Sequence, residues 1–524
     1  MKVVTSQTMA KTEKWAFTEL DYSPSEWMQL AGTGVASVVE RFAEENLLQS
    51  AATIIAGKGN NAGDGFVAAR ILASRGWHLR IALLVKKEDL NSLAAEEAKK
   101  CADAGLIIEE ISSKQDLIKF ASMSNEAVFI DALFGTGFKG EVEGIFVDAI
   151  EFLNSLPNPV ISIDVPSGMS GTTGPNQKHI IQADLTIAIG LPKAGYFIAN
   201  GWDYVRRIEL VDVLMPMEAI DKMESDLEWF TYAEARTLLP YLKPTRNKYS
   251  RGFLGIVAGS KGLYGAAKLT SMGALRAGAG IIKLPYPANA SQEMAGMPVE
   301  IVGVPLKERP QAQLSSDDTV EIAASLEKAD AIVIGPGLSR DAVAGTLIKN
   351  LVDRLQGKKF VFDADALNHL ADGAFVPPAG SILTPHSGEM MRLLGVTDHD
   401  KFLRDFRVLC SEYAKKHQVI VLLKGGPSWI FTGEKTWVVT SGDCGLATAG
   451  SGDVLSGVIG ALCCQGLSPL DATLVGTWLH GRAGTLAAAD FSGHSVIATD
   501  IANYIAYAIR NLPGKSRFTY LNQR

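Results

Sequence analysis

The sequence of 524 residues contains few cysteines and no long apolar run. Its five cysteines include no Cys-x-x-Cys pair, which argues against a structural zinc site and against a disulfide framework. No stretch of about 18 uninterrupted apolar residues occurs, so we expect no membrane-spanning helix. The first residues show no apolar segment after a basic one, so no secretory signal is predicted. These absences favour a soluble protein of a reducing compartment.

Positive charge is also scarce, because 50 lysines and arginines face 57 aspartates and glutamates, a net charge of −7. This balance argues against a general electrostatic attraction to nucleic acid. Anionic ligands must then be held locally, by loops and helix ends. We therefore expect a cytoplasmic protein, assembled as a homo-oligomer, whose partners are small molecules and neither nucleic acid nor membrane.

Length and patterning predict two large α/β domains. The chain exceeds the ~250–300 residues of one core, and 47% of it is hydrophobic. Short strands that are apolar on both faces alternate with helical segments, as in parallel βαβ units. The expected strands are 52–56, 79–85, 127–131, 160–165, 185–189 and 207–211 in the first half, and 253–258, 280–284, 331–334, 360–363, 382–383, 419–423, 429–431 and 435–439 in the second. Two helix patterns, at 25–28 and 35–42, precede them, and an acidic segment without strand character separates the halves at 215–228.

The most informative motif of the first half is the glycine-rich segment G-K-G-N-N-A-G-D-G at residues 57–65. It follows a strand and precedes a helix expected over 66–74, where backbone N–H groups and the helix dipole favour an anion. Asp64 adds a carboxylate beside this anion site. The spacing and the paired asparagines differ from the usual G-x-G-x-x-G of dinucleotide-binding dehydrogenases, which argues against that class.

Two more polar segments follow later strands of the first half, D-A-L-F-G-T-G at 131–137 and S-I-D-V-P-S-G at 162–168. Ligands of open parallel sheets bind beyond the carboxyl ends of the strands, so the three segments should converge. Their hard oxygen atoms suit a hard cation. The side chains concerned are Asn60, Asn61, Asp64, Asp131, Asp164 and Ser167. Taken alone, Asp131 is explained equally well as a helix N-cap, and Pro166-Ser167-Gly168 as a plain turn.

The second half carries its own glycine-rich segment, A-G-S-G-D at residues 449–453, before a helix expected from Val454. The N–H groups of Gly450, Ser451 and Gly452 can stabilise charge that develops on a phosphate. Asp453 can take a proton from a substrate hydroxyl, although a helix cap is the simpler explanation of that residue.

Other strand ends of the second half are also polar, at 335–337 (G-P-G), 384–389 (T-P-H-S-G-E) and 424–428 (K-G-G-P-S). Lys424 either neutralises a phosphate or is a solvated lysine. His386 either stacks on or hydrogen-bonds to a ligand, or caps the next helix.

The three motifs of the first half closely resemble those of the NAD(P)H-hydrate epimerase family, over residues 1–215. The resemblance implies a Rossmann-like three-layer α/β sandwich and a potassium ion held by Asn61, Asp131 and Ser167. It also makes Asp164 the acid/base residue, since epimerisation at C6 of the nicotinamide ring requires proton transfer. Ala62 stands where the family usually has glycine. The residues implied to contact the hydrated dinucleotide are Asn60, Asn61, Ala62, Gly63, Asp64, Gly135, Thr136, Gly137, Phe138, Lys139, Gly140, Glu141 and Asp164.

The second half, from residue 229 onward, resembles the ribokinase-like superfamily and within it the NAD(P)H-hydrate dehydratases. The discriminating segments are N-K-Y-S-R-G at 247–252 and T-P-H-S-G-E at 384–389. The resemblance implies a magnesium ion and ADP or ATP, with ADP favoured by analogy to bacterial fusions, and it makes Asp453 the catalytic base. The implied dinucleotide contacts are Ala266, Ala267, Gly337, His386 and Asp453, and the implied nucleotide contacts are Lys424, Gly425, Gly426, Pro427, Ser428 and Gly452.

Together the resemblances predict an epimerase domain at 1–220, a linker at 221–228 and a ribokinase-like α/β dehydratase domain at 229–524. The predicted function is repair of hydrated NADH and NADPH: the R and S hydrates are epimerised, and the S form is dehydrated through a phosphorylated intermediate. One alternative is a small-molecule kinase of the hydroxymethylpyrimidine or sugar type with a regulatory N-terminal domain. Another is an N-terminal domain that only senses the dinucleotide.

Overall fold

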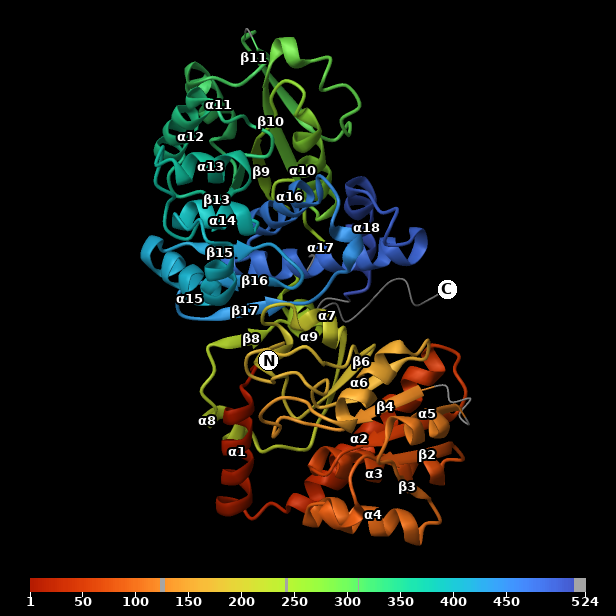
Figure 1. Ribbon diagram of the computed structural model, residues 1–524. Helices are drawn as coiled ribbons and strands as arrows, with labels where there is room; N and C mark the ends of the chain where they lie inside the picture. Colours follow the sequence, from red (N-terminus) through yellow and green to blue (C-terminus); the bar gives the residue numbers. More distant parts are fainter. Residues whose placement is uncertain (123–127, 241–243, 310, 513–524) are drawn as a thin grey trace. The chain divides into compact units, whose positions relative to one another are not determined.

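The computed structural model describes residues 1–122, 128–240, 244–309 and 311–512. The chain divides into two compact units, one of residues 2–227 and one of residues 228–524 together with Met1. The first is coloured red to yellow and the second yellow-green to blue (Figure 1). Within the described ranges, no helix has both the length and the apolar character needed to cross a membrane.

The first unit is built on a parallel sheet. Among its described residues seven strands pair in the order β3-β2-β1-β4-β5-β6-β7. All these pairs are parallel. The strands are β1 (Ala51–Ala56), β2 (His78–Leu83), β3 (Ile108–Glu110), β4 (Val128–Ala132), β5 (Val160–Ile163), β6 (Leu185–Ile189) and β7 (Arg207–Val211). The order reverses between β1 and β4, which is where ligands of such sheets bind.

Helices cover both faces of this sheet. They are α1 (Ser6–Glu19), α2 (Pro24–Glu45), α3 (Asn60–Ser74), α4 (Ser92–Asp103), α5 (Lys114–Ser122), α6 (Ile145–Ser155), α7 (Gly201–Val205) and α8 (Met217–Lys222). Successive strand residues point to opposite faces, so Ile54 packs in a core with α2, α3 and α4, and Ile55 in a core with α5 and α6. The predicted three-layer α/β sandwich is confirmed.

The second unit contains a longer sheet of the order β11-β10-β9-β12-β13-β14-β15-β16-β17-β8. Its strands are β8 (Leu227–Trp229), β9 (Phe253–Val257), β10 (Ile281–Pro287), β11 (Val302–Leu306), β12 (Ala331–Ile334), β13 (Lys359–Phe362), β14 (Ile382–Leu383), β15 (Ile420–Leu423), β16 (Ser428–Phe431) and β17 (Thr436–Val439). Pairing is parallel from β11 to β15, and β16 is antiparallel to both β15 and β17. The α/β class is confirmed here too.

The helices of the second unit lie on both sides of that sheet (Figure 1). They are α9 (Tyr232–Leu238), α10 (Tyr264–Arg276), α11 (Thr319–Leu326), α12 (Ala342–Arg354), α13 (Asp365–Ala371), α14 (Ser387–Leu394), α15 (His399–His417), α16 (Ser451–Cys464), α17 (Pro469–Phe491) and α18 (Ala498–Arg510). A core of strand side chains with α10, α16, α17 and α18 fills one face. Figure 1 shows α11 to α15 along the other.

The expected strands are confirmed, and those at 185–189, 207–211, 331–334 and 382–383 match to the residue. Ala127, the first residue of one expected strand, lies outside the described residues. The sequence missed β3 and β11, whose residues are largely exposed, because such strands lack the two-sided apolar pattern. It also missed β8, at the end of the acidic segment expected to lack strand character.

Three helix expectations were wrong in detail. The patterns at 25–28 and 35–42 belong to one helix, α2, and α1 precedes it. Helix α3 begins at Asn60, inside the glycine-rich segment, because Gly59 is extended and caps it. Gly65 is therefore a packing position, where an added Cβ would meet Ala132 of β4 at 3.0 Å. Helix α16 likewise begins early, at Ser451.

Candidate active sites

The first candidate site lies where the neighbouring strands β1, β4 and β5 end, and Asp131 joins two of these ends. Its carboxylate is fully buried and accepts hydrogen bonds from Ser162 Oγ at 2.8 Å, from Ser167 N at 2.9 Å and from Ser167 Oγ at 2.6 Å. Burial raises the pKa of Asp131 above its usual value, although these bonds oppose the shift. Asp131 lies within β4, so the helix-cap explanation of this residue is wrong.

Asn61 approaches the same turn from α3. Its Nδ2 donates to the carbonyl oxygen of Phe134 at 3.0 Å, and Phe134 N donates to Ser167 Oγ at 2.9 Å. Asn61 is buried, and its Oδ1 has no hydrogen-bond partner among the described residues. The three residues implied as potassium ligands, Asn61, Asp131 and Ser167, are thus brought together around one backbone turn.

Asp164 is held by three groups beyond the end of β5. Lys193 forms an ion pair with its Oδ1, and Thr136 N donates to its Oδ2 at 3.3 Å. Tyr196 donates a hydrogen bond to its backbone oxygen, and the residue has a φ of 65°, which is rare outside glycine. A backbone in this region is costly, so the surrounding contacts fix the carboxylate in place.

Two further carboxyl groups share this environment. Burial raises the pKa of Asp64 well above its usual value, and the charges of Asp164 and Glu13 add to the shift. Burial likewise raises the pKa of Glu13 to about 7, against the lowering effect of Lys193. One ammonium therefore faces three carboxyl groups, and the protonated form of Asp64 and Glu13 is favoured.

The remaining predicted contacts of the first half lie around this centre. Asn60 accepts a hydrogen bond from Asn91 at 2.7 Å, and Gly63 lies against Met28. Ala62 is helical and buried, so alanine fits where the family usually has glycine. The 135–141 segment is a loop in which Phe138 stacks on Phe134 and Lys139, Gly140 and Glu141 are exposed.

The second candidate site lies where β13 and β15 end and α16 begins. Gly450, in a left-handed conformation with a φ of 86°, is the N-cap of α16, and Asp453 lies in the first helical turn. The explanation of Asp453 as the helix cap is therefore wrong. Its carboxylate is placed beside the free N–H groups of a helix start.

Lys424 is paired rather than solvated. Its Nζ donates to Asp363 Oδ1 at 2.8 Å, and Ser456 Oγ donates to Asp363 Oδ2 at 2.5 Å. Burial by itself would lower the pKa of Lys424. The negative charges of Asp363, Glu389 and Asp453 outweigh this effect, so the pKa of Lys424 is raised. An added Cβ at Gly452 would lie 3.3 Å from Nζ, so the glycine leaves the space beside this cation open.

The surroundings of Asp453 give its carboxyl group a pKa suited to a general base. Burial, followed by the charge of Asp363, raises its pKa to about 7, although Lys424 opposes the shift. A general base works best with a pKa near the operating pH. His480 braces the helix start, with Nε2 at 2.9 Å from the backbone oxygen of Ser451, and burial lowers the pKa of His480 to about 4.

His386 caps a helix, as the simpler explanation held. Its Nδ1 accepts a hydrogen bond from Gly388 N at 3.0 Å at the start of α14, and its own N donates to Glu389 at 2.9 Å. The backbone of His386 forms an isolated parallel β-bridge with that of Lys424. Of the His386 side chain, 56% is exposed. The ring thus remains accessible next to the 424–428 turn, which Ser428 Oγ closes by donating to Gly425 O at 3.0 Å.

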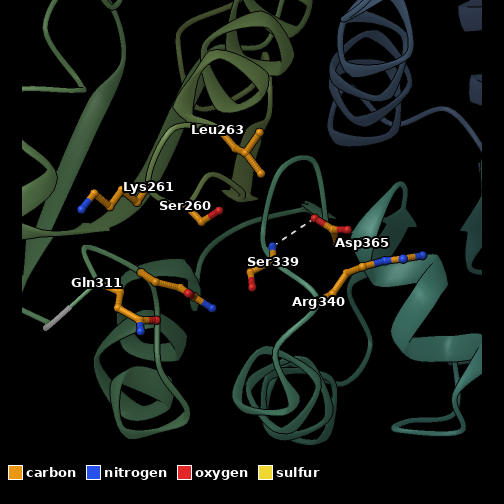
Figure 2. Close-up of a pocket in the computed structure, with 8 residues that line it drawn as sticks. Ser260, Lys261, Leu263, Gln311, Ser339, Arg340 and Asp365 are labelled. Atoms are coloured by element: carbon orange, nitrogen blue, oxygen red, sulfur yellow. Dashed lines mark hydrogen bonds between the residues drawn. The ribbon is translucent and has the colours of Figure 1, made fainter.

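A pocket of about 460 Å³ lies beside this site (Figure 2). Gly337 lies next to this lining, because Ser260 Oγ donates a hydrogen bond to Gly337 O at 2.9 Å. An added Cβ at 337 would lie 2.8 Å from Leu263 O and 3.1 Å from Ala266 Cβ. Ala267, in contrast, packs into the core. Asp365 accepts a hydrogen bond from Ser339 N at 3.0 Å. The negative charge of Asp365 also helps to raise the pKa of Asp453. The lining residues are Ser260, Lys261, Leu263, Gln311, Gln313, Ser339, Arg340 and Asp365.

Sequence reasoning did not find Lys193, Asp363, Asp365, His480 or Glu13. Lys193 follows the strand expected at 185–189, and Asp363 is the last residue of the strand expected at 360–363, so the strand-end argument applied to Asp164 would have found both. Asp365 stands two residues after such a strand end. Glu13 and His480 lie inside helices, where no sequence signal distinguished them.

Comparisons with known proteins match the two units to two different family models. The family model described as YjeF-related protein N-terminus matches residues 24–195, and that described as NAD(P)H-hydrate dehydratase matches residues 254–507. Relatives named bifunctional NAD(P)H-hydrate repair enzyme Nnr include one from Moorella thermoacetica, 34% identical over 98% of this chain and 97% of the relative. Another, from Escherichia coli, is 31% identical over 86% of this chain and 83% of the relative.

Among solved structures, the ADP/ATP-dependent NAD(P)H-hydrate dehydratase from Bacillus subtilis, co-crystallised with ATP and Mg²⁺, is 26% identical. The match covers 54% of this chain and 98% of that chain, with a TM-score of 0.47.

Fold and sites together define a two-domain α/β enzyme with a separate carboxylate-centred site in each unit. Each unit is matched by a different family model, and the M. thermoacetica relative is matched over nearly its whole length. The chain belongs to the family of bifunctional NAD(P)H-hydrate repair enzymes.

Proposed function

We propose that the first unit interconverts the R and S hydrates of NADH and NADPH, and that the second dehydrates the S hydrate with ADP or ATP. One observation carries the proposal: each unit holds an acidic residue suited to proton transfer where its family motifs meet. In the first unit this is Asp164 beside Lys193, and in the second it is Asp453, with a pKa of about 7. The fusion suits the order of the reactions, because the epimerase supplies the epimer that the dehydratase accepts.

Asp164 is the proposed acid/base residue of the epimerase. The Lys193 ammonium and Thr136 N orient its two oxygens, and the adjoining 135–141 loop would hold the dinucleotide. A carboxylate fixed beside C6 of the nicotinamide ring can take up and return the proton that inversion at that carbon requires.

The donor set of the first site fits potassium. Asn61 Oδ1 is a buried acceptor without a partner among the described residues, and Asp131 and Ser167 add carboxylate and hydroxyl oxygens at the same turn. Such oxygens are the ligands of hard cations. A bound potassium ion would supply a fixed positive charge beside the glycine-rich segment.

Asp453 is the proposed base of the dehydratase, and it would take the proton of the C6 hydroxyl as the phosphoryl group is transferred to it. Lys424 and the N–H groups at the start of α16 would neutralise the charge that develops on the phosphoryl oxygens. Loss of the phosphate then restores the dihydropyridine ring. Residues 424–428 would bind the donor nucleotide together with Gly452, which lies beside the Lys424 ammonium.

The second site also fits a magnesium ion that is bound together with nucleotide phosphates. In the part of the chain that the structure describes, no three metal-ligating side chains of the His, Cys, Asp and Glu types converge. Magnesium in phosphoryl transfer is usually held by one or two carboxylates plus substrate phosphates, so this donor count is sufficient. Glu389, whose charge acts on Lys424, is the proposed carboxylate, which leaves Asp453 free to act as the base. The ion would supply neutralising charge to the phosphates.

The pocket of Figure 2 would receive the anionic half of the dinucleotide. Lys261 and Arg340 give two cations to its lining. The predicted contact Gly337 adjoins the lining through the hydrogen bond that Ser260 Oγ donates to its carbonyl oxygen. ADP is the preferred donor by analogy with bacterial members of the family. We place the enzyme in the cytoplasm as a homo-oligomer that binds small nucleotides and no nucleic acid.

The test is repair itself. The full chain is incubated with a mixture of R and S NADH hydrate, magnesium, potassium and either ADP or ATP, and the absorbance of reduced nicotinamide is followed. Recovery of all the cofactor supports both activities. If recovery stops with the R hydrate unconsumed, the first unit is a dinucleotide sensor and not an epimerase. If no cofactor is recovered and a sugar or pyrimidine is phosphorylated instead, the chain is a small-molecule kinase.

A further inference from the structure

Two glutamines line the pocket of Figure 2 and take no part in the proposed proton or phosphoryl transfer. Gln311 and Gln313 face the cavity, whereas Ala312 and Leu314, which alternate with them, are buried at 8% and 1% exposure. Neither amide group forms a hydrogen bond within the part of the chain that the structure describes. Two neutral groups, each able to donate and to accept, are therefore available to a ligand.

The backbone that carries these glutamines is fixed by hydrogen bonds to other segments. The Tyr264 hydroxyl of α10 donates to Ala312 O at 2.9 Å, and Ala312 N donates to Arg309 O at 3.0 Å. Arg309 Nε lies 3.1 and 3.2 Å from the two carboxylate oxygens of the buried Asp318. Asn289 Nδ2 also donates to Arg309 O, at 2.6 Å. The two amides are thus presented from a fixed backbone, as a selective binding site requires.

The other side of the pocket is held equally firmly and is built around Ser339 (Figure 2). This residue has a φ of 103°, which is rare outside glycine. Its N–H donates to Asp365 Oδ2 at 3.0 Å, and its carbonyl oxygen lies 2.8 Å from His369 Nε2. Helix α13 therefore holds both ends of the residue. A backbone of this kind persists only where its surroundings over-determine it, and such residues cluster at ligand sites.

The chemistry of the lining suits a purine base that is joined to phosphate. A glutamine amide can pair with the N6 and N7 edge of adenine through one accepted and one donated hydrogen bond. Leu263, which lines the pocket and is 50% exposed, offers an apolar surface to the face of the ring. Lys261 and Arg340 offer the positive charge that binds phosphate. An adenylate group can use all of these side chains at once.

The place of the pocket assigns it to the adenylate half of the hydrated dinucleotide. Asp453, which must reach C6 of the nicotinamide ring, is not among the described residues that line the pocket. The two places are neighbours, because the lining residue Asp365 follows Asp363 by two residues, and Asp363 accepts a hydrogen bond from Ser456 of α16. With the nicotinamide ring at Asp453, the other half of the same molecule can extend into the pocket.

We infer that Gln313, assisted by Gln311, recognises the adenine edge of hydrated NADH and NADPH and so determines specificity in the second unit. This inference rests on the proposed dehydratase activity. Gln313 is half-buried and Gln311 is exposed, so water competes less for the amide of Gln313. Adenine lies away from the reacting carbon, so its contacts are the same before and during the reaction. Loss of such a contact should raise KM and leave kcat unchanged.

The experiment measures dehydration by the full chain with ADP and magnesium, for the wild type and its Gln313→Ala, Gln311→Ala and Gln292→Ala variants. The substrates are the S hydrates of NADH, of its hypoxanthine analogue and of reduced nicotinamide mononucleotide, which lacks the adenylate half. For Gln313→Ala we expect an unchanged kcat and about a 10-fold higher KM for NADH hydrate, as loss of a bidentate contact to a base predicts. Gln311→Ala should cause a smaller rise. Gln292→Ala, the same change at an exposed position outside the lining, should cause none.

The two other substrates test which end and which edge are bound. In the hypoxanthine analogue an oxygen replaces the N6 amino group, so the amide loses one of its two hydrogen bonds. The wild type should have a higher KM for this analogue than for NADH hydrate, and Gln313→Ala should make the two KM values equal. For the mononucleotide hydrate, kcat/KM should be the same in the wild type and in Gln313→Ala.

An unchanged KM for NADH hydrate in Gln313→Ala, or an equal loss with the mononucleotide hydrate, overturns the inference while the dehydratase activity stands. A lower kcat with every substrate also overturns it, because Gln313 then supports the fold or the reacting ring. A wild-type chain that dehydrates none of the substrates refutes the proposed dehydratase activity, and the inference with it.

Discussion

Lys424 Nζ donates a hydrogen bond to Asp363 Oδ1 at 2.8 Å, in the site where the dehydratase motifs meet. The two residues follow different strands, β15 and β13, and Ser456 of α16 binds the other carboxylate oxygen. Asp363 is almost fully buried. This carboxylate therefore connects the lysine that would neutralise phosphate to the helix that carries the proposed base.

Asp363→Asn should weaken the second unit in both stability and activity. The change leaves a largely buried ammonium with less compensation, and removal of one partner of a buried pair typically costs about 3–5 kcal/mol. We expect a lower Tm and a higher KM for ADP or ATP, with R-to-S conversion unchanged. Asp372→Asn, at an exposed position after α13, is the control, and an equal loss there would contradict this role.

Asp453→Asn should reduce dehydration of S hydrate by at least about 100-fold and leave epimerisation intact. In the wild type, dehydration should rise with pH through about 7, because the base must be ionised to accept a proton. A flat profile between pH 6 and 8, taken as about one unit either side of that value, would show that Asp453 is not the base.

The same substitution should change how stability depends on pH. Burial raises the pKa of Asp453 from 3.8 to about 7 in the folded chain. Its contribution to stability is then complete below the lower value and is lost as pH rises through the higher one. Asp453→Asn should therefore raise Tm above that of the wild type at pH 8, and the two should converge below pH 4. Calorimetry across this range measures the difference.

Asp164→Ala should stop repair with the R hydrate left over, while pure S hydrate is still dehydrated. The fully buried Lys193 loses its ion-pair partner, which typically costs about 3–5 kcal/mol, so the first unit should also unfold more easily. Asp164→Asn retains the shape of the side chain. It therefore separates the loss of acid/base chemistry from the loss of stability. If Asp164→Asn converts R hydrate at the wild-type rate, the acid/base assignment fails.

Gly337→Ala should disturb the pocket beside the second site, because Gly337 contacts the lining residues Ser260 and Leu263. A methyl group there lies 2.8 Å from Leu263 O, and the φ of 61° costs alanine about 1–2 kcal/mol in addition. Gly380→Ala has a similar φ of 79° but open surroundings, so it measures the backbone strain alone. We expect a higher KM for S hydrate with Gly337→Ala only. Equal kinetics in the two variants would remove this pocket from the substrate site.

Potassium removal should lower epimerase activity and the Tm of the first unit, because Asn61 Oδ1 loses its only proposed partner. Dialysis into a buffer with a bulky organic cation, followed by potassium titration, measures both effects. Asn61→Ala should abolish the potassium dependence of Tm. A wild-type Tm that does not respond to potassium would contradict the site.

The strand-end argument explains most of what could be predicted before the fold was known. Asp131, Asp164, Lys424 and Asp453 all follow or flank apolar strands or open a helix, and parallel sheets gather such positions at one edge. Helix limits were less predictable, because Gly59 and Gly450 cap helices that begin inside the glycine-rich segments. Whether His386 caps a helix or faces a ligand depended on where α14 begins relative to β15.

The sequence by itself determined the α/β class, the two halves and their family motifs, since apolar strand patterns and glycine spacing are local properties. Only the tertiary structure decided the charge partners. Lys193 pairs with Asp164, Asp363 pairs with Lys424, and Glu13 reaches the epimerase site from a helix without a motif. The physical reason is that a pKa depends on burial and on charges from distant segments, and neither exists until the chain has folded.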